Sequence, residues 1–123
     1  MAKVLVVDDS KDLIDFIAHL LRMKRYEVCT ALNKHEIFGC IDAFMPDIIV
    51  LDVMLETENG RDICKDIKRI KRFSHIPTIL MSGAPTQLQH YTECYADDVI
   101  EKPFSPQALL NKINRQLQGN IFL

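Results

Sequence analysis

The chain has 123 residues, of which 48% are hydrophobic and 26% charged, a composition that supports one globular core and excludes an intrinsically disordered chain. Its net charge of −2 gives no electrostatic reason to expect nucleic acid or an anionic membrane as the main partner. No apolar run reaches the roughly 18 residues that a membrane-spanning helix needs. We expect a single domain over residues 1–123, with a core at roughly 3–118, a tail at 119–123 and a cytoplasmic location.

The first half of the chain alternates strand patterns with helix patterns. Residues 3–7 form a near-continuous apolar run, which is typical of a strand buried on both faces. Ser10 is a candidate N-cap for the helix that follows. Apolar residues then recur with helical spacing at Leu13, Ile17, Leu20 and Leu21. The next expected elements are a strand over 26–32, a helix from Asn33 to Pro46 and a buried strand over 48–51.

The second half continues the same alternation. A helix is expected after Asn59-Gly60, with Ile63, Ile67 and Ile70 on its buried side. A fourth strand over 78–81 follows, and then a short, weakly patterned helix from Pro85 through about Cys94. Val99 and Ile100 make a brief fifth strand. The last helix begins at Pro106 and should end at Gly119, because proline suits a helix start and glycine a helix end.

Five strands that alternate with five helices predict an α/β fold. Parallel strands need helical crossovers, so we expect a doubly wound parallel sheet with helices on both of its faces. Ligands of such sheets bind at the carboxyl ends of the strands. The residues that directly follow each apolar run are therefore the place to look for a functional site.

Polar residues suited to phosphate chemistry stand at those strand ends. Asp8 and Asp9 follow the first strand, Asp52 the third, Ser82 the fourth and Lys102 the fifth. Clustered carboxylates need a cation, and oxygen ligands select a hard one such as Mg²⁺. A carboxylate can also attack phosphorus, while a lysine neutralises charge and a serine donates a hydrogen bond. Together these side chains make a complete phosphoacceptor site.

Taken singly, each of these residues has an ordinary structural explanation. Asp8 could cap a helix, Asp52 and Ser82 could be turn residues, and Lys102 could be a solvated loop lysine. The joint placement at successive strand ends is what favours a site.

The sequence resembles the receiver domains of response regulators in two-component signalling. The resemblance covers nearly the whole chain and rests on four motifs in the right order: VLVVDDS at 4–10, IIVLDVML at 48–55, LMSG at 80–83 and ADDVIEKPF at 96–104. It implies a flavodoxin-like sheet with strand order 2-1-3-4-5. It also implies that Asp52 is the phosphoacceptor.

The resemblance assigns the other site residues in turn. Asp8 and Asp9 would hold Mg²⁺ together with Asp52 and the backbone carbonyl of Met54. Ser82 would hydrogen-bond the phosphoryl group. Lys102 would pair with that group, and the peptide bond before Pro103 would be cis.

Three positions depart from the family pattern. Glu56 replaces the usual proline, which predicts a looser loop after the third strand. Tyr95 replaces a glycine and would crowd the turn before the fifth strand. The switch positions of the family are Ser82 and Val99, and Val99 replaces the usual aromatic residue, so signalling by a moving ring is not expected.

The function implied is a phosphorylation switch with Mg²⁺ as cofactor. A sensor histidine kinase or a phosphotransfer protein would donate the phosphoryl group, and an output partner not identified by the sequence would respond. In the family the responding face is the fourth helix, fifth strand and fifth helix, where a homodimer would also form. The chain would act on no substrate beyond its own Asp52.

Three alternative functions agree less well with the sequence. A pseudo-receiver that only docks proteins is supported by Glu56 and Val99 and opposed by the intact acids, Ser82 and Lys102. An aspartyl-phosphate phosphatase would need an acid at position 54, where the chain has methionine. The basic residues at 61–72 alternate with acidic ones, which indicates a solvated helix face and not a nucleic-acid site.

Overall fold

The computed structural model of the chain describes residues 1–119. Strands and helices alternate along these residues. The first elements are β1 (Lys3–Val7), α1 (Lys11–Met23), β2 (Glu27–Ala31), α2 (Lys34–Phe44), β3 (Ile48–Asp52) and α3 (Gly60–Arg69). They are followed by β4 (Thr78–Ser82), two short 3₁₀ turns η1 (Pro85–Gln87) and η2 (Tyr91–Cys94), β5 (Asp98–Glu101) and α4 (Pro106–Gly119).

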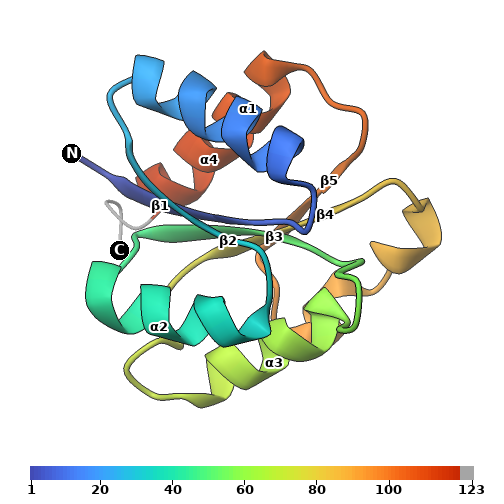
Figure 1. The fold of residues 1–123 in the computed structure, drawn as a ribbon. Helices are drawn as coiled ribbons and strands as arrows, with labels where there is room; N and C mark the ends of the chain where they lie inside the picture. The colour runs from blue at the N-terminus through green and yellow to red at the C-terminus, as the bar shows by residue number, and fades with distance from the viewer. Residues whose placement is uncertain (120–123) are drawn as a thin grey trace.

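The five strands form one parallel sheet in the order β2-β1-β3-β4-β5. Helices α1 and α4 cover one face of this sheet, and α2 and α3 cover the other (Figure 1). The doubly wound α/β fold and its strand order, both expected from the sequence, are confirmed. The order reverses between β1 and β3, so the carboxyl ends of these neighbouring strands frame the crevice where such sheets bind ligands.

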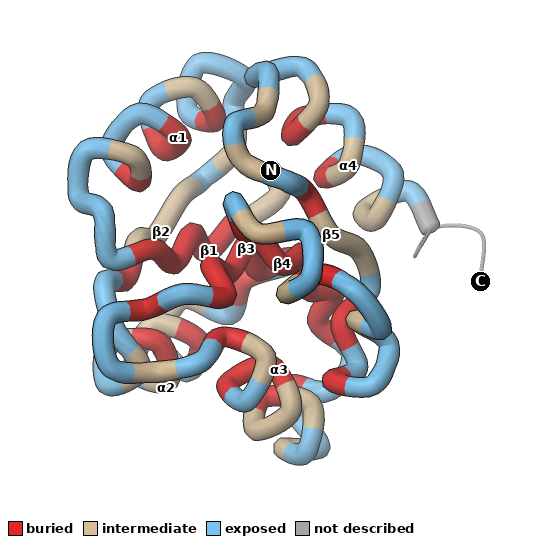
Figure 2. Tube along the Cα trace, turned by 90° about the vertical axis from the view of Figure 1, so that its right-hand side faces the viewer, coloured by how far each residue is buried: buried red, intermediate tan, exposed pale blue. Residues whose placement is uncertain are grey.

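The core consists of two apolar layers, one on each side of the sheet, because successive strand residues point to opposite faces. In β1, Leu5 and Val7 join the layer under α2 and α3, whereas Val4 and Val6 join the layer under α1 and α4. Nearly all residues of the central strands β1, β3 and β4 are buried (Figure 2). Each large apolar side chain buried there stabilises the fold by about 1.5–3 kcal/mol.

The expected N-caps are present. The Ser10 side chain accepts a hydrogen bond from the Leu13 N–H, and the Asn33 side chain accepts one from the Glu36 N–H. The second strand is one residue shorter at each end than expected, and α4 reaches Gly119. The rest of the expected tail, 120–123, lies outside the described residues. None of the helices found in residues 1–119 has the length and hydrophobicity to cross a bilayer.

The expected count of five helices is wrong for the described residues, which contain four α-helices. Where a helix was expected over 85–94, the chain forms η1 and η2 instead. Few apolar residues are available there, and Leu88 and Cys94 are the buried ones. A short helix needs an apolar face because its nucleation is unfavourable. Left-handed backbone at His90 and Tyr95, with φ of 53° and 65°, also interrupts the segment.

Candidate functional site

Three carboxylates from two neighbouring strands meet at the carboxyl edge of the sheet. Asp8 directly follows β1 and is 1% exposed, Asp52 ends β3 and is 4% exposed, and Asp9 is exposed. Oxygen atoms of the three carboxylates lie within 4.8 Å of one another. The parallel pairing of β1 with β3 produces this convergence, because it places residues 7 and 51 side by side.

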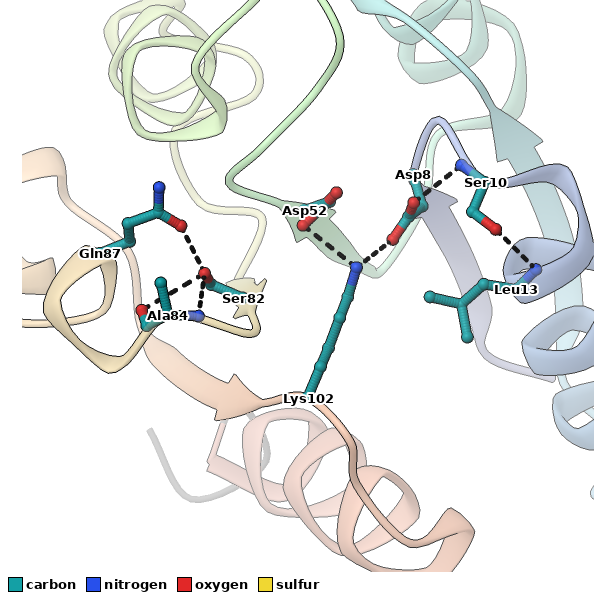
Figure 3. A network of polar contacts seen from close by, with 8 residues as sticks. All are labelled: Asp8, Ser10, Leu13, Asp52, Ser82, Ala84, Gln87 and Lys102. Carbon is teal, nitrogen blue, oxygen red and sulfur yellow. Dashed lines mark hydrogen bonds and ion pairs between the residues drawn. The ribbon is translucent and has the colours of Figure 1, made fainter.

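The Lys102 side chain reaches into this cluster from the segment after β5. Its Nζ lies 2.6 Å from Asp8 Oδ2 and 3.3 Å from Asp52 Oδ1 (Figure 3). The peptide bond from Lys102 to Pro103 is cis, and the Lys102 N–H donates to the Ser82 carbonyl at a distance of 2.8 Å. One ammonium thus pairs with two of the three carboxylates, so the cluster keeps an excess of negative charge.

The close packing of these charged groups changes the pKa values of Asp52 and Lys102. Burial first, and then the neighbouring Asp8 carboxylate, raises the pKa of Asp52 to about 6, although Lys102 and the Met54 N–H act in the opposite direction. Burial alone would lower the pKa of Lys102, but Asp8 and Asp52 more than compensate, and the net pKa is raised. At neutral pH, Asp52 is therefore an anion whose negative charge is not fully balanced by positive charge within the protein.

Asp8 is fixed by the start of α1. Its Oδ1 accepts the Ser10 N–H at 2.9 Å, while its Oδ2 faces Lys102. The carboxylate is therefore oriented from both sides before any ligand enters. The N-terminus of α1 also carries partial positive charge, which favours an anion at this position.

Gly60 is a positioning residue whose role the sequence did not reveal. Its N–H donates to the Val53 carbonyl at 2.7 Å, and a Cβ on Gly60 would lie 2.1 Å from the Asp52 carbonyl oxygen. Only glycine allows α3 to begin this close to the end of β3. The Asn59-Gly60 pair was visible in the sequence, but it indicated a helix start and not contact with Asp52.

The backbone of Met54 lies beside Asp52, as the Met54 N–H interacts with the Asp52 carboxylate. Met54 also pairs with Asn59 in an isolated antiparallel bridge, and its side chain is 60% exposed. This bridge holds the first residues after β3 next to the start of α3. The backbone of residue 54 is therefore near the cluster, while its side chain faces solvent.

Ser82 lies at the end of β4 but is not part of the carboxylate cluster. Its Oγ donates to Gln87 Oε1 at 2.5 Å and accepts the Ala84 N–H at 3.0 Å. Figure 3 shows the Ser82 side chain directed toward Gln87, on the other side of Asp52 from Asp8. Across residues 1–119, no hydrogen bond joins the Ser82 side chain to Asp52 or to Lys102. Gln87 had no signal in the sequence.

A family model for the response regulator receiver domain matches residues 4–114. The chain belongs to this family. Regulatory protein VanR of Enterococcus faecium is 32% identical over 118 residues, which cover 94% of this chain and 50% of VanR. The receiver domain described here thus spans about half the length of that relative.

Solved structures of similar proteins share the fold. A putative response regulator from Chloroflexus aurantiacus has a TM-score of 0.89 and 27% identity, with 95% of this chain and 98% of that chain covered. The chemotaxis response regulator CheY4 of Vibrio cholerae has a TM-score of 0.87 and 29% identity, with 95% and 99% covered. The resemblance found in the sequence is therefore confirmed at the level of the family.

The three departures of this receiver domain have different structural consequences. In the loop with Glu56, the backbones of Leu55 and Glu58 exchange two hydrogen bonds, and the expectation that this loop is looser than in the family stays a prediction. Tyr95 has the left-handed backbone that suits glycine. The residue is 58% exposed, so its ring does not crowd the turn. Val99 is half-buried and packs on the core layer under α2 and α3.

Replacement of Gly60 by alanine should destabilise the domain. The Cβ would collide with backbone atoms of Asp52, which cannot move without shifting β3, so we expect a loss of about 1–3 kcal/mol in the free energy of unfolding. Gly39→Ala is the matched control, because no atom lies within 4 Å of a Cβ there and alanine favours the helix. Urea unfolding measures both variants, and equal stability of Gly60→Ala and the wild type would contradict the assignment.

Neutralisation of Asp52 should stabilise the metal-free domain at neutral pH. Since the folded pKa of about 6 exceeds the unfolded value, the folded state binds more protons between these values, and the free energy of unfolding falls as pH rises through that window. Asp52→Asn removes this penalty, so we expect a gain of about 1–3 kcal/mol above pH ~6 that vanishes below pH ~4.

The measurement is urea unfolding in the presence of a chelator across that pH range. Asp47→Asn serves as the control, because Asp47 is exposed at the other end of the same strand and should give no gain. Loss of stability in Asp52→Asn above pH ~6 would mean that Lys102 already compensates Asp52 fully.

Proposed function

We propose that this receiver domain accepts a phosphoryl group on Asp52 from the phosphohistidine of a sensor histidine kinase or a phosphotransfer protein. The observation that carries the proposal is the Asp52 carboxylate, held at a strand end with the Lys102 ammonium 3.3 Å away and two further acids beside it. Phosphoryl transfer onto a carboxylate requires a nucleophile and cations that neutralise the phosphoryl charge; Asp52 and Lys102 supply the nucleophile and one cation, and the acids offer a place for a second cation.

The proposed cofactor is Mg²⁺. Its ligands would be the Asp8, Asp9 and Asp52 carboxylates and the backbone carbonyl of Met54. The donor set fits the ion, because it consists of oxygen atoms and because one ammonium leaves the three carboxylates undercompensated. When bound, Mg²⁺ would neutralise charge on the phosphoryl oxygens.

The residues of the chain have separate parts in the reaction. An Asp52 carboxylate oxygen forms a bond to phosphorus as the bond from phosphorus to the donor imidazole nitrogen breaks, which yields an acyl phosphate and a free histidine. With a pKa of about 6, Asp52 is mostly ionised at neutral pH and is able to attack. The Lys102 ammonium already lies beside the attacking group and pairs with a phosphoryl oxygen.

The acyl phosphate is a temporary modification. Attack by water on phosphorus releases phosphate and restores the Asp52 carboxylate, so the domain transforms no substrate other than its own side chain. Ser82 would hydrogen-bond the phosphoryl group while it is present. Ser82 and position 99 are the proposed switch positions.

The proposed output is regulation of a partner by the face that includes η1, η2, β5 and α4. This face corresponds to the one expected from the sequence, with two 3₁₀ turns in place of the expected helix. A homodimer through the same face is part of the proposal, as are a single receiver domain over residues 1–123, a cytoplasmic location and the absence of direct contact with nucleic acid. Excess negative charge at the site opposes nucleic-acid binding there.

Acetyl phosphate should phosphorylate the protein when Mg²⁺ is present. The phosphoryl group of this donor is already activated, so positioning and charge neutralisation at the site suffice. Intact mass spectrometry should detect one added phosphoryl group, which is stable in acid and lost in base. Beryllofluoride, which stands in for a phosphoryl group on a carboxylate, should bind at the same place.

Two variants localise the modification. Asp52→Asn should lose both reactions, because an amide is a poor nucleophile and has no charge, whereas Asp47→Asn should keep them. Unmodified wild type with donor and Mg²⁺ present would favour the pseudo-receiver, a docking module without phosphorylation. Phosphorylation that persists in Asp52→Asn would place the acceptor elsewhere.

A further inference from the structure

The Ser82 hydroxyl is already engaged in the unphosphorylated domain. It is buried, it donates its hydrogen to Gln87 Oε1 at 2.5 Å with the Ala84 carbonyl as a longer alternative acceptor at 3.4 Å, and its oxygen accepts the Ala84 N–H at 3.0 Å. A hydroxyl has a single hydrogen to donate. Ser82 therefore cannot donate to Gln87 and to an anion on Asp52 at the same time.

Gln87 belongs to the segment 85–94, which packs on the core through Leu88 and Cys94 and is also held by polar contacts. It ends η1, and the following residues up to Cys94 form no α-helix. Arg61 on α3 donates to three backbone carbonyls of this segment, those of Gln87, Gln89 and His90, at 2.8 to 3.0 Å. The Ser82–Gln87 hydrogen bond joins a side chain of the same segment to the end of β4 (Figure 3).

Gln87 is also next to the phosphorylation site. It lines the same surface hollow as residues 53–59, the loop that follows Asp52. Arg61 is adjacent to Gly60, whose backbone is pressed against Asp52. The segment 85–94 is therefore joined to two elements beside Asp52, to the end of β4 through the Ser82 side chain and to the start of α3 through Arg61.

We propose that Gln87 is a positioning residue that competes with the Asp52 phosphoryl group for the Ser82 hydroxyl. The inference rests on the proposed function. A phosphoryl oxygen that takes the Ser82 hydrogen leaves Gln87 without its partner, while the Arg61 bonds and the buried Leu88 and Cys94 still hold the segment 85–94. Phosphorylation thus releases one polar contact of the segment, and Gln87 determines how readily that happens.

The test compares beryllofluoride binding, in the presence of Mg²⁺, among variants of the whole domain. Gln87→Ala removes the competing acceptor, so beryllofluoride should bind about two- to tenfold more tightly than to the wild type, the effect of one hydrogen bond. Gln89→Ala is the matched control, because its backbone carbonyl also binds Arg61 while its side chain has no bond to Ser82. Its affinity should equal that of the wild type.

Two further variants separate competition from a general change of structure. Gln87→Glu keeps an acceptor oxygen and should show no gain in affinity. In a Ser82→Ala background, Gln87→Ala should have no effect, because the hydroxyl at issue is gone. Fluorine NMR of bound beryllofluoride reports all of these affinities directly.

The outcomes separate this inference from the proposed function. Beryllofluoride that binds the wild type and Gln87→Ala equally, or binds Gln87→Ala more weakly, would overturn the role of Gln87 and leave phosphorylation of Asp52 intact. A gain that persists in the Ser82→Ala background would overturn the role as well. Failure of the wild type to bind beryllofluoride would overturn the proposed function and the inference together.

Discussion

The site depends on one ammonium group that is shared by two buried carboxylates. Lys102 Nζ lies 2.6 Å from Asp8 and 3.3 Å from Asp52, and both acids are almost fully excluded from solvent. Burial of a charge is costly unless the charge is paired. With the exposed Asp9 nearby, a single lysine is too little for three acids, and the pKa of Asp52 is raised by its burial first and then by Asp8. In the proposed function, this arrangement would favour a metal ion and, once the ion is present, a phosphoryl group.

The sheet supplies the geometry that keeps this arrangement in place. Parallel pairing of β1 with β3 puts Asp8 and Asp52 at the same edge, and β5 lies beyond β4, so Lys102 must reach back across the end of β4. The backbone bond from Lys102 to the Ser82 carbonyl secures that path. Gly60 lets α3 start against Asp52. The acids, the lysine and Ser82 are thus fixed to four adjacent strands, while the segment 85–94, which has no α-helix, is held by the buried Leu88 and Cys94 and by side-chain bonds.

Sequence patterns predicted the parts of this structure that depend on local chemistry. Apolar runs located the strands, side-chain caps located the helix starts, and the strand-end rule brought Asp8, Asp52 and Lys102 together. Features outside these patterns were missed. The helix expected at 85–94 is absent because its sequence offers too little apolar surface, and the Ser82–Gln87 bond depends on how the chain turns after β4. Likewise, the need for glycine at position 60 comes from the Asp52 carbonyl, which no local pattern shows.

A pH titration followed by the NMR shift of the Asp52 carboxyl carbon, with and without Mg²⁺, tests most directly whether the site has an excess of negative charge. In the metal-free domain the pKa should be about 6, because burial and Asp8 outweigh the single ammonium of Lys102. Saturating Mg²⁺ should lower this pKa well below its metal-free value, since the cation favours the ionised form. The contrary result is a metal-free pKa near the ordinary value of about 4 that Mg²⁺ leaves unchanged. It would mean that Lys102 already balances the negative charge of the acids and that the site has no excess negative charge.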